Sequence, residues 1–198
     1  MILSILVCSV TTRFNNFLPN IINKLHKQAE MFEGVEIICL LDNKTIMLGD
    51  KRNELVKLAC GKYVVFVDDD DDISDDYIEK LFFATDSNVD IINFTVSVSL
   101  NGGEYKPCLY NMDYENDYNE SNKEGQIVSY HRLPNHIMCV KRELAIDTIY
   151  PSIIRGEDAG YSKSLKPKLK SQLILNDTLY FYNFNQETTE TQKYIKRK

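Results

Sequence analysis

The sequence of 198 residues predicts an α/β fold in which a mainly parallel central sheet is flanked by helices. Two observations support this prediction. Up to about residue 90, continuous apolar runs alternate with segments whose apolar residues recur at helical spacing, and the links between them are short. Continuous apolar runs are typical of parallel strands buried on both faces, and the alternation of strand with helix is typical of βαβ units.

Three strands and three helices are expected in this first part of the chain. The strands are residues 2–10, 35–41 and 63–67. Apolar residues at helical spacing cover residues 18–29, 55–59 and 77–82. We expect Asn15 or Asn16 to cap the first helix and Asp50 to cap the second, with Gly61 just after its end.

The second part of the chain has a different pattern. Residues 90–100 and 104–110 flank Asn101-Gly102-Gly103, which is typical of a β-hairpin. Residues 111–125 are polar and rich in Tyr and Asn, so we expect a loop there. The remaining expected elements are helices at 140–149 and 157–165, a strand or strand pair at 173–184, and a polar tail at 186–198.

Composition and charge exclude several classes of protein. The net charge of −6 argues against a protein that binds nucleic acid through bulk positive charge. The five cysteines include no CxxC pair, which argues against a zinc knuckle. Cys8, Cys39 and Cys139 lie in apolar runs and are expected to be buried. An odd number of widely spaced cysteines indicates a reducing compartment, so we expect a cytoplasmic protein.

Membrane segments are not expected from the sequence. No apolar run approaches 18 residues, so the chain shows no transmembrane segment. The apolar N-terminus is short and lacks a basic leader and a small-residue cleavage site. We therefore interpret it as a buried strand rather than a signal peptide.

An acidic cluster follows the third expected strand: seven of the nine residues from Asp68 to Asp76 are Asp. A solvated acidic face is one interpretation of such a run. Carboxylates packed this closely repel one another, however, which favours a bound cation. In an extended segment Asp68 and Asp70 point to the same side, and two carboxylates suit Mg²⁺ or Mn²⁺. An EF-hand calcium loop is not supported, because Ile73 stands where that loop requires Gly.

Polar residues follow all three expected strands, at Thr11-Thr12-Arg13, Asp42-Asn43 and Asp68-Asp69-Asp70. In an open parallel sheet, ligands bind beyond the carboxyl ends of the strands, so we expect these segments to converge on one crevice. The first strand is not followed by GxGxxG, and the chain contains no GxxxxGK[ST]. Neither a Rossmann dinucleotide site nor a P-loop is therefore supported.

An ordered set of motifs resembles the family 2 glycosyltransferases. Arg52-Asn53 matches the family's RN pair, and Ala59-Cys60-Gly61-Lys62-Tyr63 matches its A-x-G-x-Y pattern. The following strand closes in Asp68-Asp69-Asp70-Asp71, which matches DxDD. Arg155-Gly156-Glu157-Asp158 resembles the family's GED motif. The resemblance covers most of the chain up to residue 85 and, more thinly, residues 131–184.

This resemblance implies a GT-A fold, which is Rossmann-like with a small antiparallel portion on the acceptor side. It implies a single domain over residues 1–185, with a nucleotide-sugar-binding half (1–90) and an acceptor-side half (91–185). It also implies a metal-dependent, inverting transfer from a nucleotide-sugar, most often a UDP-sugar, with Mn²⁺ or Mg²⁺ as cofactor. The acceptor stays open among a glycan, a protein, a lipid carrier and a modified nucleobase.

The same resemblance implies roles for individual residues. Asp158 would be the catalytic base, with Glu157 as the next candidate, although the helix dipole also favours a carboxylate at a helix start. Asp68 and Asp70 would bind the metal, while Asp68 could instead meet the ribose, and Asp42 would contact the base. The full set expected to bind the nucleotide-sugar is Thr11, Arg13, Asp42, Lys51, Arg52, Asp68 and Asp69.

Some features leave alternatives open. The chain has no Pro near Thr11, a single acidic residue at the second strand end, and Tyr161 where the family often has Trp. His131 could be a third metal ligand, an acceptor contact or a structural residue, and His136 gives a weaker signal still. A nucleotidyltransferase of similar fold would carry a Gly-rich, Lys-containing loop after the first strand, which this chain lacks. A non-catalytic nucleotide- or metal-binding relative is the other alternative, although the intact acidic motifs argue against it.

Overall fold

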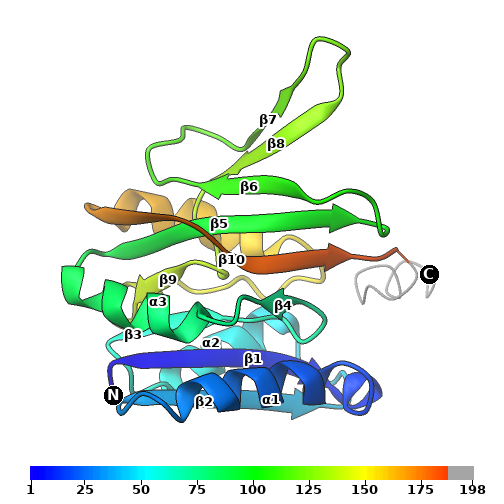
Figure 1. The fold of residues 1–198 in the computed structure, drawn as a ribbon. Helices are drawn as coiled ribbons and strands as arrows, with labels where there is room; N and C mark the ends of the chain where they lie inside the picture. The colour runs from blue at the N-terminus through cyan, green and yellow to red at the C-terminus, as the bar shows by residue number, and fades with distance from the viewer. Residues whose placement is uncertain (187–198) are drawn as a thin grey trace.

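The computed structural model describes residues 1–186, and its strands form one ten-stranded sheet with helices on its faces (Figure 1). The strands are β1 (Leu3–Val10), β2 (Val35–Asp42), β3 (Tyr63–Phe66), β4 (Asp72–Ile73), β5 (Ile91–Leu100), β6 (Lys106–Tyr110), β7 (Tyr118–Ser121), β8 (Ile127–Arg132), β9 (Cys139–Lys141) and β10 (Gln172–Phe184). The α-helices are α1 (Leu18–Ala29), α2 (Leu48–Leu58), α3 (Tyr77–Ala84), α4 (Arg142–Ile146) and α5 (Glu157–Leu165). Short 3-10 helices are η1 (Thr11–Arg13), η2 (Thr85–Ser87) and η3 (Lys166–Lys168).

Parallel strands form the centre of the sheet. β1 lies between β2 and β3 and is parallel to both, with Leu3 in register with Val35 and Tyr63. β9 is antiparallel to both β3 and β5, so β5 runs in the same direction as β1, and β10 is parallel to β5. The predicted α/β fold with a mainly parallel central sheet is therefore confirmed. Beyond β5, the strands β6, β8 and β7 form a smaller portion that includes antiparallel pairs.

Helices cover both faces of this sheet. α1 packs beside α3, and both lie in front of the sheet in the view of Figure 1. α2 lies behind the sheet in that view and packs beside α4 and α5. The chain passes from β1 to β2 through α1 and then returns past β1 to β3 through α2. Because crossovers between parallel strands are right-handed, these two opposite moves place α1 and α2 on opposite faces of the sheet.

The two apolar runs that form β1 and β2 differ in burial. β1 is central, and all of its residues except Val10 are buried. β2 forms the edge of the sheet, so its residues are only partly buried or exposed, and Cys39 is exposed. The predicted burial of this strand and of Cys39 is therefore wrong, because an apolar run does not reveal which strand ends a sheet. Cys8 and Cys139 are buried as predicted, and all five cysteines are free thiols.

The last strand, β10, crosses β5 rather than following one edge of it. Its first residues pair with the start of β5, from Gln172 with Ile91, and its last residues pair with the end, up to Phe184 with Leu100. The register shifts between Leu175 and Thr178, and Figure 1 shows β10 crossing from one edge of β5 to the other. This crossing brings the end of β10 to the carboxyl ends of the parallel strands.

The second part of the chain contains elements that the sequence did not predict. The segment 111–125, expected to be a loop, contains β7, which pairs antiparallel with β8. All four residues of β7 are exposed, so the strand has no apolar alternation by which it could be recognised. The helix expected at 140–149 covers only α4, because β9 occupies the start of that range. Apart from Gln186, the predicted polar tail lies outside the described residues.

The predicted helix caps are wrong. Neither Asn15 nor Asn16 caps α1, which begins without a side-chain cap and has Pro19 in its first turn. Proline is tolerated there because its missing N–H has no intrahelical partner in any case. α2 begins two residues before Asp50, whose carboxylate accepts a hydrogen bond from the Ser152 hydroxyl (2.6 Å). Asp50 therefore ties α2 to the segment that precedes α5.

Two glycines allow the close approaches on which the site depends. At Gly61 a Cβ atom would lie 2.6 Å from the backbone nitrogen of Ser4, so glycine lets the segment before β3 pack against β1. At Gly49 a Cβ atom would lie 2.3 Å from the carbonyl oxygen of Pro151. The second approach brings α2 close to the chain that leads into α5. No helix in the described part of the chain is long and apolar enough to cross a membrane.

Candidate active site

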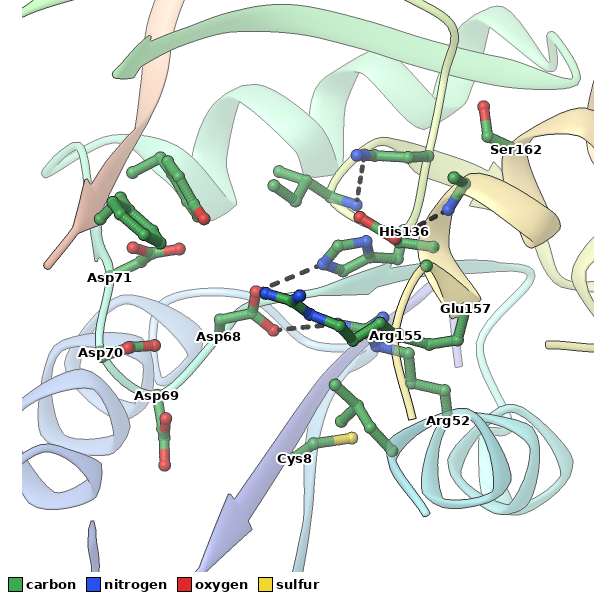
Figure 2. Close-up of a pocket in the computed structure, with 18 of the residues that line it drawn as sticks. Cys8, Arg52, Asp68, Asp69, Asp70, Asp71, His136, Arg155, Glu157 and Ser162 are labelled. Atoms are coloured by element: carbon green, nitrogen blue, oxygen red, sulfur yellow. Dashed lines mark hydrogen bonds and ion pairs between the residues drawn. The ribbon is translucent and has the colours of Figure 1, made fainter. Parts of the chain in front are cut away.

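A cavity of about 720 Å³ opens at the carboxyl ends of β1 and β3 and extends over β5, β6, β8 and β10 (Figure 2). Residues from η1, α2, the acidic cluster and α5 line it together. Those with polar or charged side chains include Arg13, Lys51, Arg52, Asp68, Asp69, Asp70, Asp71, Glu157 and Asp158. The structure thus brings together most of the residues that the sequence singled out, although they come from segments up to 145 positions apart.

The acidic cluster forms a turn and does not continue β3. The strand ends at Phe66, and the backbone N–H of Asp71 donates to the carbonyl oxygen of Asp68 (3.4 Å). The expectation that this segment is extended is therefore wrong. Figure 2 shows Asp68 directed toward His136, whereas Asp69 points away from Asp68. Each carboxylate of the turn consequently has its own partners.

Arg13 holds two carboxylates of the turn. Its Nη1 lies 2.5 Å from Asp69 Oδ1, and its Nη2 lies 2.8 Å from Asp70 Oδ2. The Ser9 hydroxyl donates to the other oxygen of Asp69 (2.5 Å), and the guanidinium group of Arg13 lies over the ring of Phe17. These contacts fix η1 against the acidic cluster, as the predicted convergence of strand ends requires.

Arg52 connects the acidic cluster to α5. Its side chain is almost completely buried, with Nη1 2.9 Å from Glu157 Oε1 and Nη2 3.3 Å from Asp68 Oδ1. The guanidinium group also lies over the rings of Phe66 and Tyr150. Burial would lower the pKa of Arg52, but Asp68 and the other neighbouring groups raise it, so the residue stays charged. Arg52 therefore bridges the two carboxylates from inside the protein.

His136 is a site residue to which the sequence gave little weight. Its Nε2 lies 3.3 Å from Asp68 Oδ2, and its carbonyl oxygen accepts a hydrogen bond from the backbone of Phe66 (3.1 Å). Burial would raise the pKa of Asp68, but His136 and Arg52 lower it below its ordinary value, so Asp68 is ionised. His136 lies in a loop outside any motif, so the sequence gave only a weak signal for it.

Asp70 and Asp71 are in a less favourable electrostatic environment. Burial raises the pKa of both, and the nearby Asp68 raises them further, although Arg13 acts against this at Asp70. Asp71 accepts hydrogen bonds from the Tyr180 hydroxyl (2.8 Å) and the backbone N–H of Asn183 (2.9 Å). The same Tyr180 oxygen accepts a hydrogen bond from the backbone of Asp68 (3.0 Å), so β10 supports the turn.

Two arginines pair with four carboxylates in this part of the cavity, which Lys51 and Arg155 also line. Arg13 forms ion pairs with Asp69 and Asp70. Arg52 forms ion pairs with Asp68 and Glu157. Within residues 1–186, no group of three His, Cys, Asp or Glu side chains is arranged to hold a metal ion. Two carboxylates with open positions for substrate oxygens nevertheless suit Mg²⁺ or Mn²⁺. Among the described residues, Asp68 makes contacts of 3.3 Å to the side chains of Arg52 and His136, which leaves its oxygens open to a further ligand, whereas Asp70 pairs with Arg13 at 2.8 Å.

Asp42 and Thr11 lie beside the cavity rather than in its lining. One oxygen of Asp42 accepts hydrogen bonds from the backbone N–H groups of Thr45 (2.6 Å) and Ile46 (2.9 Å), and the carboxylate forms an ion pair with buried Lys51. Burial would raise the pKa of Asp42, but the Lys51 and backbone hydrogen bonds lower it to about 2. Asp42 thus organises the loop between β2 and α2, and Thr11 is exposed.

The two candidate bases at the start of α5 have different surroundings. The helix follows Gly156, which has a left-handed backbone conformation (φ 78°). Glu157 is buried and held by Arg52, whereas Asp158 is half-buried, lines the cavity and accepts a hydrogen bond from the Ala159 backbone (2.8 Å). No ion pair to Asp158 is formed within the described residues. Asp158 is therefore the carboxylate better placed to take a proton from a bound molecule.

His131 is remote from the acidic cluster. It lies in β8, where its ring stacks on Tyr118 with 4.3 Å between ring centroids. Its ring nitrogens lie 3.0 Å from the Tyr114 hydroxyl and 3.0 Å from the Ser129 hydroxyl. These contacts hold the β7–β8 hairpin together and favour a structural role for His131, away from Asp68 and Asp70.

Comparisons with known proteins agree with this fold. The family model "Glycosyl transferase family 2" matches residues 16–144, which is more than half of the chain. Among solved structures, residues 1–349 of TarS from S. aureus align with a TM-score of 0.65 and 16% identity, over 92% of this chain and 60% of that one. The crystal structures of the same TarS fragment with UDP-GlcNAc and with UDP give TM-scores of 0.67 and 0.64, both at 17% identity, over 97% and 94% of this chain.

At such low identity these matches establish the fold alone, and they confirm the predicted GT-A type arrangement. The chain spans about three fifths of the length of these TarS structures. A comparison with curated protein sequences gives no significant match.

Proposed function

Because the chain belongs to glycosyl transferase family 2, we propose that it transfers a sugar from a UDP-sugar to a hydroxyl acceptor, with inversion and with the help of a divalent metal. One observation carries this proposal. Asp158, a carboxylate with no ion-pair partner in the described part of the chain, lines the same cavity as the acidic cluster that contains Asp68 and Asp70. A general base and a cation site in one cavity are what such a transfer requires. The segment after the first strand is not a Gly-rich phosphate-binding loop, so the sequence does not favour a nucleotidyltransferase.

The donor is inferred from two lines of support. The acidic cluster has the charge and oxygen ligands for Mg²⁺ or Mn²⁺, with Asp68 and Asp70 as the ligands. When bound, this ion acts as a Lewis acid on the diphosphate leaving group. TarS, which shares the fold, was crystallised with UDP-GlcNAc and with UDP, and this favours UDP as the nucleotide to test first.

The residues around the cation site act mainly as positioning groups. Arg52 holds Asp68 and Glu157 at once, so it fixes α5 relative to the acidic cluster. Asp42 and Lys51 shape the loop that would border the nucleotide base, and Arg13 orients Asp69 and Asp70. Because these groups are already paired, little reorganisation is needed when the substrate binds.

In the transfer step, an acceptor hydroxyl oxygen attacks the anomeric carbon from the face opposite the diphosphate. The new C–O bond forms as the bond to the phosphate oxygen breaks, and UDP leaves with the electron pair of that bond. Asp158 takes the proton of the attacking hydroxyl, a role that contributes typically about 10²–10⁴-fold to the rate. Attack from the opposite face through an oxocarbenium-like state inverts the configuration.

A screen of nucleotide-sugars tests this proposal. Thermal unfolding is measured with UDP-, GDP- and other nucleotide-sugars, each with and without Mn²⁺. A ligand at about 100 times its dissociation constant should add roughly 2.7 kcal/mol to the free energy of unfolding. We expect stabilisation by UDP-sugars only when Mn²⁺ is present, followed by release of UDP. Stabilisation without any UDP release over long incubation with acceptor mixtures would favour a non-catalytic relative instead.

A further inference from the structure

One face of the sheet forms a large part of the cavity, and it begins beside the acidic cluster, where the backbone of Asn183 in β10 donates to Asp71. Alternate residues of a strand point to the same face, and the cavity is lined by alternate residues of four neighbouring strands. These residues, here called the aromatic face, are Val96, Val98 and Leu100 of β5, Cys108 and Tyr110 of β6, Tyr130 and Arg132 of β8, and Tyr182 and Phe184 of β10. The cavity therefore has an acidic end, which contains Asp68–Asp71, and an aromatic face beyond it.

Strand register determines the layout of the aromatic face. Val98 is in register with Tyr182, and Cys108 is in register with Tyr130. Four neighbouring strands span roughly 14 Å, which is wider than a single sugar ring. The face has a buried floor that includes Cys108, while Tyr130 and Tyr182 are half-buried beside it. The result is a shallow trough with rings along its sides.

The trough also has polar groups along its edge. Asp117 and Asn135 line the same cavity. Asp117 Oδ1 accepts a hydrogen bond from the backbone N–H of Leu133 (2.8 Å). Asn135 Oδ1 accepts one from the backbone N–H of Ile137 (3.1 Å). The guanidinium group of Arg132 lies 5.2 Å from the ring centroid of Tyr130. Flat apolar surfaces with hydrogen-bonding groups at their edge match a sugar ring, which has C–H groups on its faces and hydroxyls around its rim.

Charge narrows the class of ligand further. The trough itself is lined by one cation, Arg132, and one anion, Asp117, and the other cations of the cavity lie outside the trough. An anionic polymer of phosphodiesters would therefore find a single cation along the trough, with Asp117 opposing it. An alkyl chain would fill the apolar floor but would leave Asn135 and Asp117 without new partners on burial. A neutral ligand that is polar at its rim fits both constraints.

We propose that the aromatic face is the acceptor site and that the acceptor is a neutral carbohydrate. This inference rests on the proposed function, because it places the attacking sugar hydroxyl at Asp158, which lines the same cavity as the trough and the acidic end. A ring stacked on Tyr182 or Tyr130 would hold the hydroxyl in line for attack, with its proton passing to Asp158 and UDP leaving as the new glycosidic bond forms. The sheet face thus selects the acceptor, and the acidic end binds the donor.

The experiment measures binding by ligand-observed NMR in the presence of UDP and Mn²⁺. The probes are methyl hexopyranosides of the common neutral sugars, ribitol phosphate as a phosphorylated polyol, and a short-chain alkyl alcohol. We expect one or more methyl hexopyranosides to bind, and Tyr182→Ala and Tyr130→Ala to weaken that binding about five- to tenfold. Tyr182→Phe should retain the binding, because the ring is kept. Phe83→Ala, which removes an exposed ring on α3, is the control and should change nothing.

UDP affinity, measured in the same samples, separates the two proposals. Failure of UDP to bind the wild-type protein would overturn the proposed function. Normal UDP affinity with no binding of any hexopyranoside would overturn the carbohydrate acceptor alone. The carbohydrate acceptor would also be overturned if ribitol phosphate or the alcohol binds instead and loses affinity in Tyr182→Ala, or if hexopyranosides bind equally well to both alanine variants.

Discussion

The acidic end and the aromatic face of the cavity belong to one sheet but are built in different ways. The acidic end follows β3 and packs on β1, whose first seven residues are buried. The aromatic face reaches out to β8, whose hairpin partner β7 is wholly exposed. Figure 1 shows this hairpin at the margin of the sheet, away from the parallel strands. The comparison indicates that buried strands support the charged groups, whereas the neutral groups extend to a hairpin with one wholly exposed strand.

Charge is also handled differently at the two ends. In the acidic end nearly every carboxylate has a fixed partner, such as Arg13 for Asp69 and Arg52 for Glu157. The aromatic face depends on ring surfaces and a few hydrogen-bonding groups. If this division is correct, substitutions in the acidic end change donor and metal binding, and those in the aromatic face change acceptor binding. The predictions below test that division, beginning with the residue at its boundary.

The largest effect is expected for Asp158→Asn. Asn is close in size to Asp and is accepted near helix starts, so structure and UDP affinity should be nearly unchanged. An amide cannot take the acceptor's proton, so turnover at saturating donor should fall by about 10²–10⁴-fold. The measurement is UDP release beside UDP affinity in the same variant. Near wild-type turnover would assign the base elsewhere.

Glu157→Gln is the matched control for this prediction. Glu157 is buried against Arg52, so its neutralisation leaves a buried guanidinium group less well paired and should lower the free energy of unfolding by about 1–3 kcal/mol. Turnover of the folded fraction should decrease less than in Asp158→Asn. A greater loss of turnover in Glu157→Gln would exchange the roles of the two carboxylates.

The next largest effect is expected for Asp70→Ala. Removal of one metal ligand should abolish the dependence of UDP binding on Mn²⁺, measured by titration calorimetry with and without the ion. The fold should persist, because burial raises the pKa of Asp70 and its charge is therefore not a source of stability. Asp75→Ala is the control, since that side chain is fully exposed in the same acidic run. Unchanged Mn²⁺-dependent affinity in Asp70→Ala would remove Asp70 from the metal site.

The sequence predicted the acidic end better than the aromatic face for a physical reason. Asp68–Asp71 and Glu157-Asp158 are contiguous in the chain, so their chemistry is visible as motifs. The parallel strands behind them are continuous apolar runs, which only deep burial favours. The arrangement of the carboxylates was not predictable, because it depends on a turn and on the partners Arg13 and His136.

The aromatic face could not be predicted because its members are far apart in the chain. Val98 and Tyr182 are neighbours only because β10 crosses beside β5, a topology that no local pattern reveals. β7 was not predicted, because residues 118–121 are mostly polar and all four are exposed. Cys39 was placed in the core because edge and central strands share the same apolar composition.

A moderate effect on stability is expected for Asp42→Asn. The folded protein lowers the pKa of Asp42 from 3.8 to about 2, so ionisation of this group favours folding above about pH 4. That contribution decreases below about pH 4 and is lost as the pH falls through about 2, where the carboxylate becomes protonated in the folded protein as well. We expect Asp42→Asn to cost about 1–2 kcal/mol at neutral pH, allowing for solvent screening, and much less at pH 2. Urea unfolding at both pH values measures this difference.

If Asp42→Asn lowers the free energy of unfolding by the same amount at both pH values, the loss of the ion pair with Lys51 is not the cause. Glu54→Gln is a suitable control, because within residues 1–186 the one ion pair of Glu54 is an exposed pair with Lys57 on the same helix α2. Such exposed pairs contribute little to stability, so that variant should be close to wild type at both pH values.

The smallest effect is expected in the β7–β8 hairpin. Tyr118 is half exposed, and its ring stacks on His131 at 4.3 Å and meets Tyr114 at 5.4 Å. Tyr118→Ala removes these contacts from a surface element, so it should lower the free energy of unfolding by only about 0.5–1 kcal/mol. Tyr118→Phe keeps the ring and should restore most of the loss. Amide hydrogen exchange should show faster opening confined to residues 118–132, while UDP affinity stays unchanged. A loss of several kcal/mol, or a matching increase of exchange in β1, would mean that the hairpin and the parallel strands unfold as one unit, and the distinction between the two regions would then not hold.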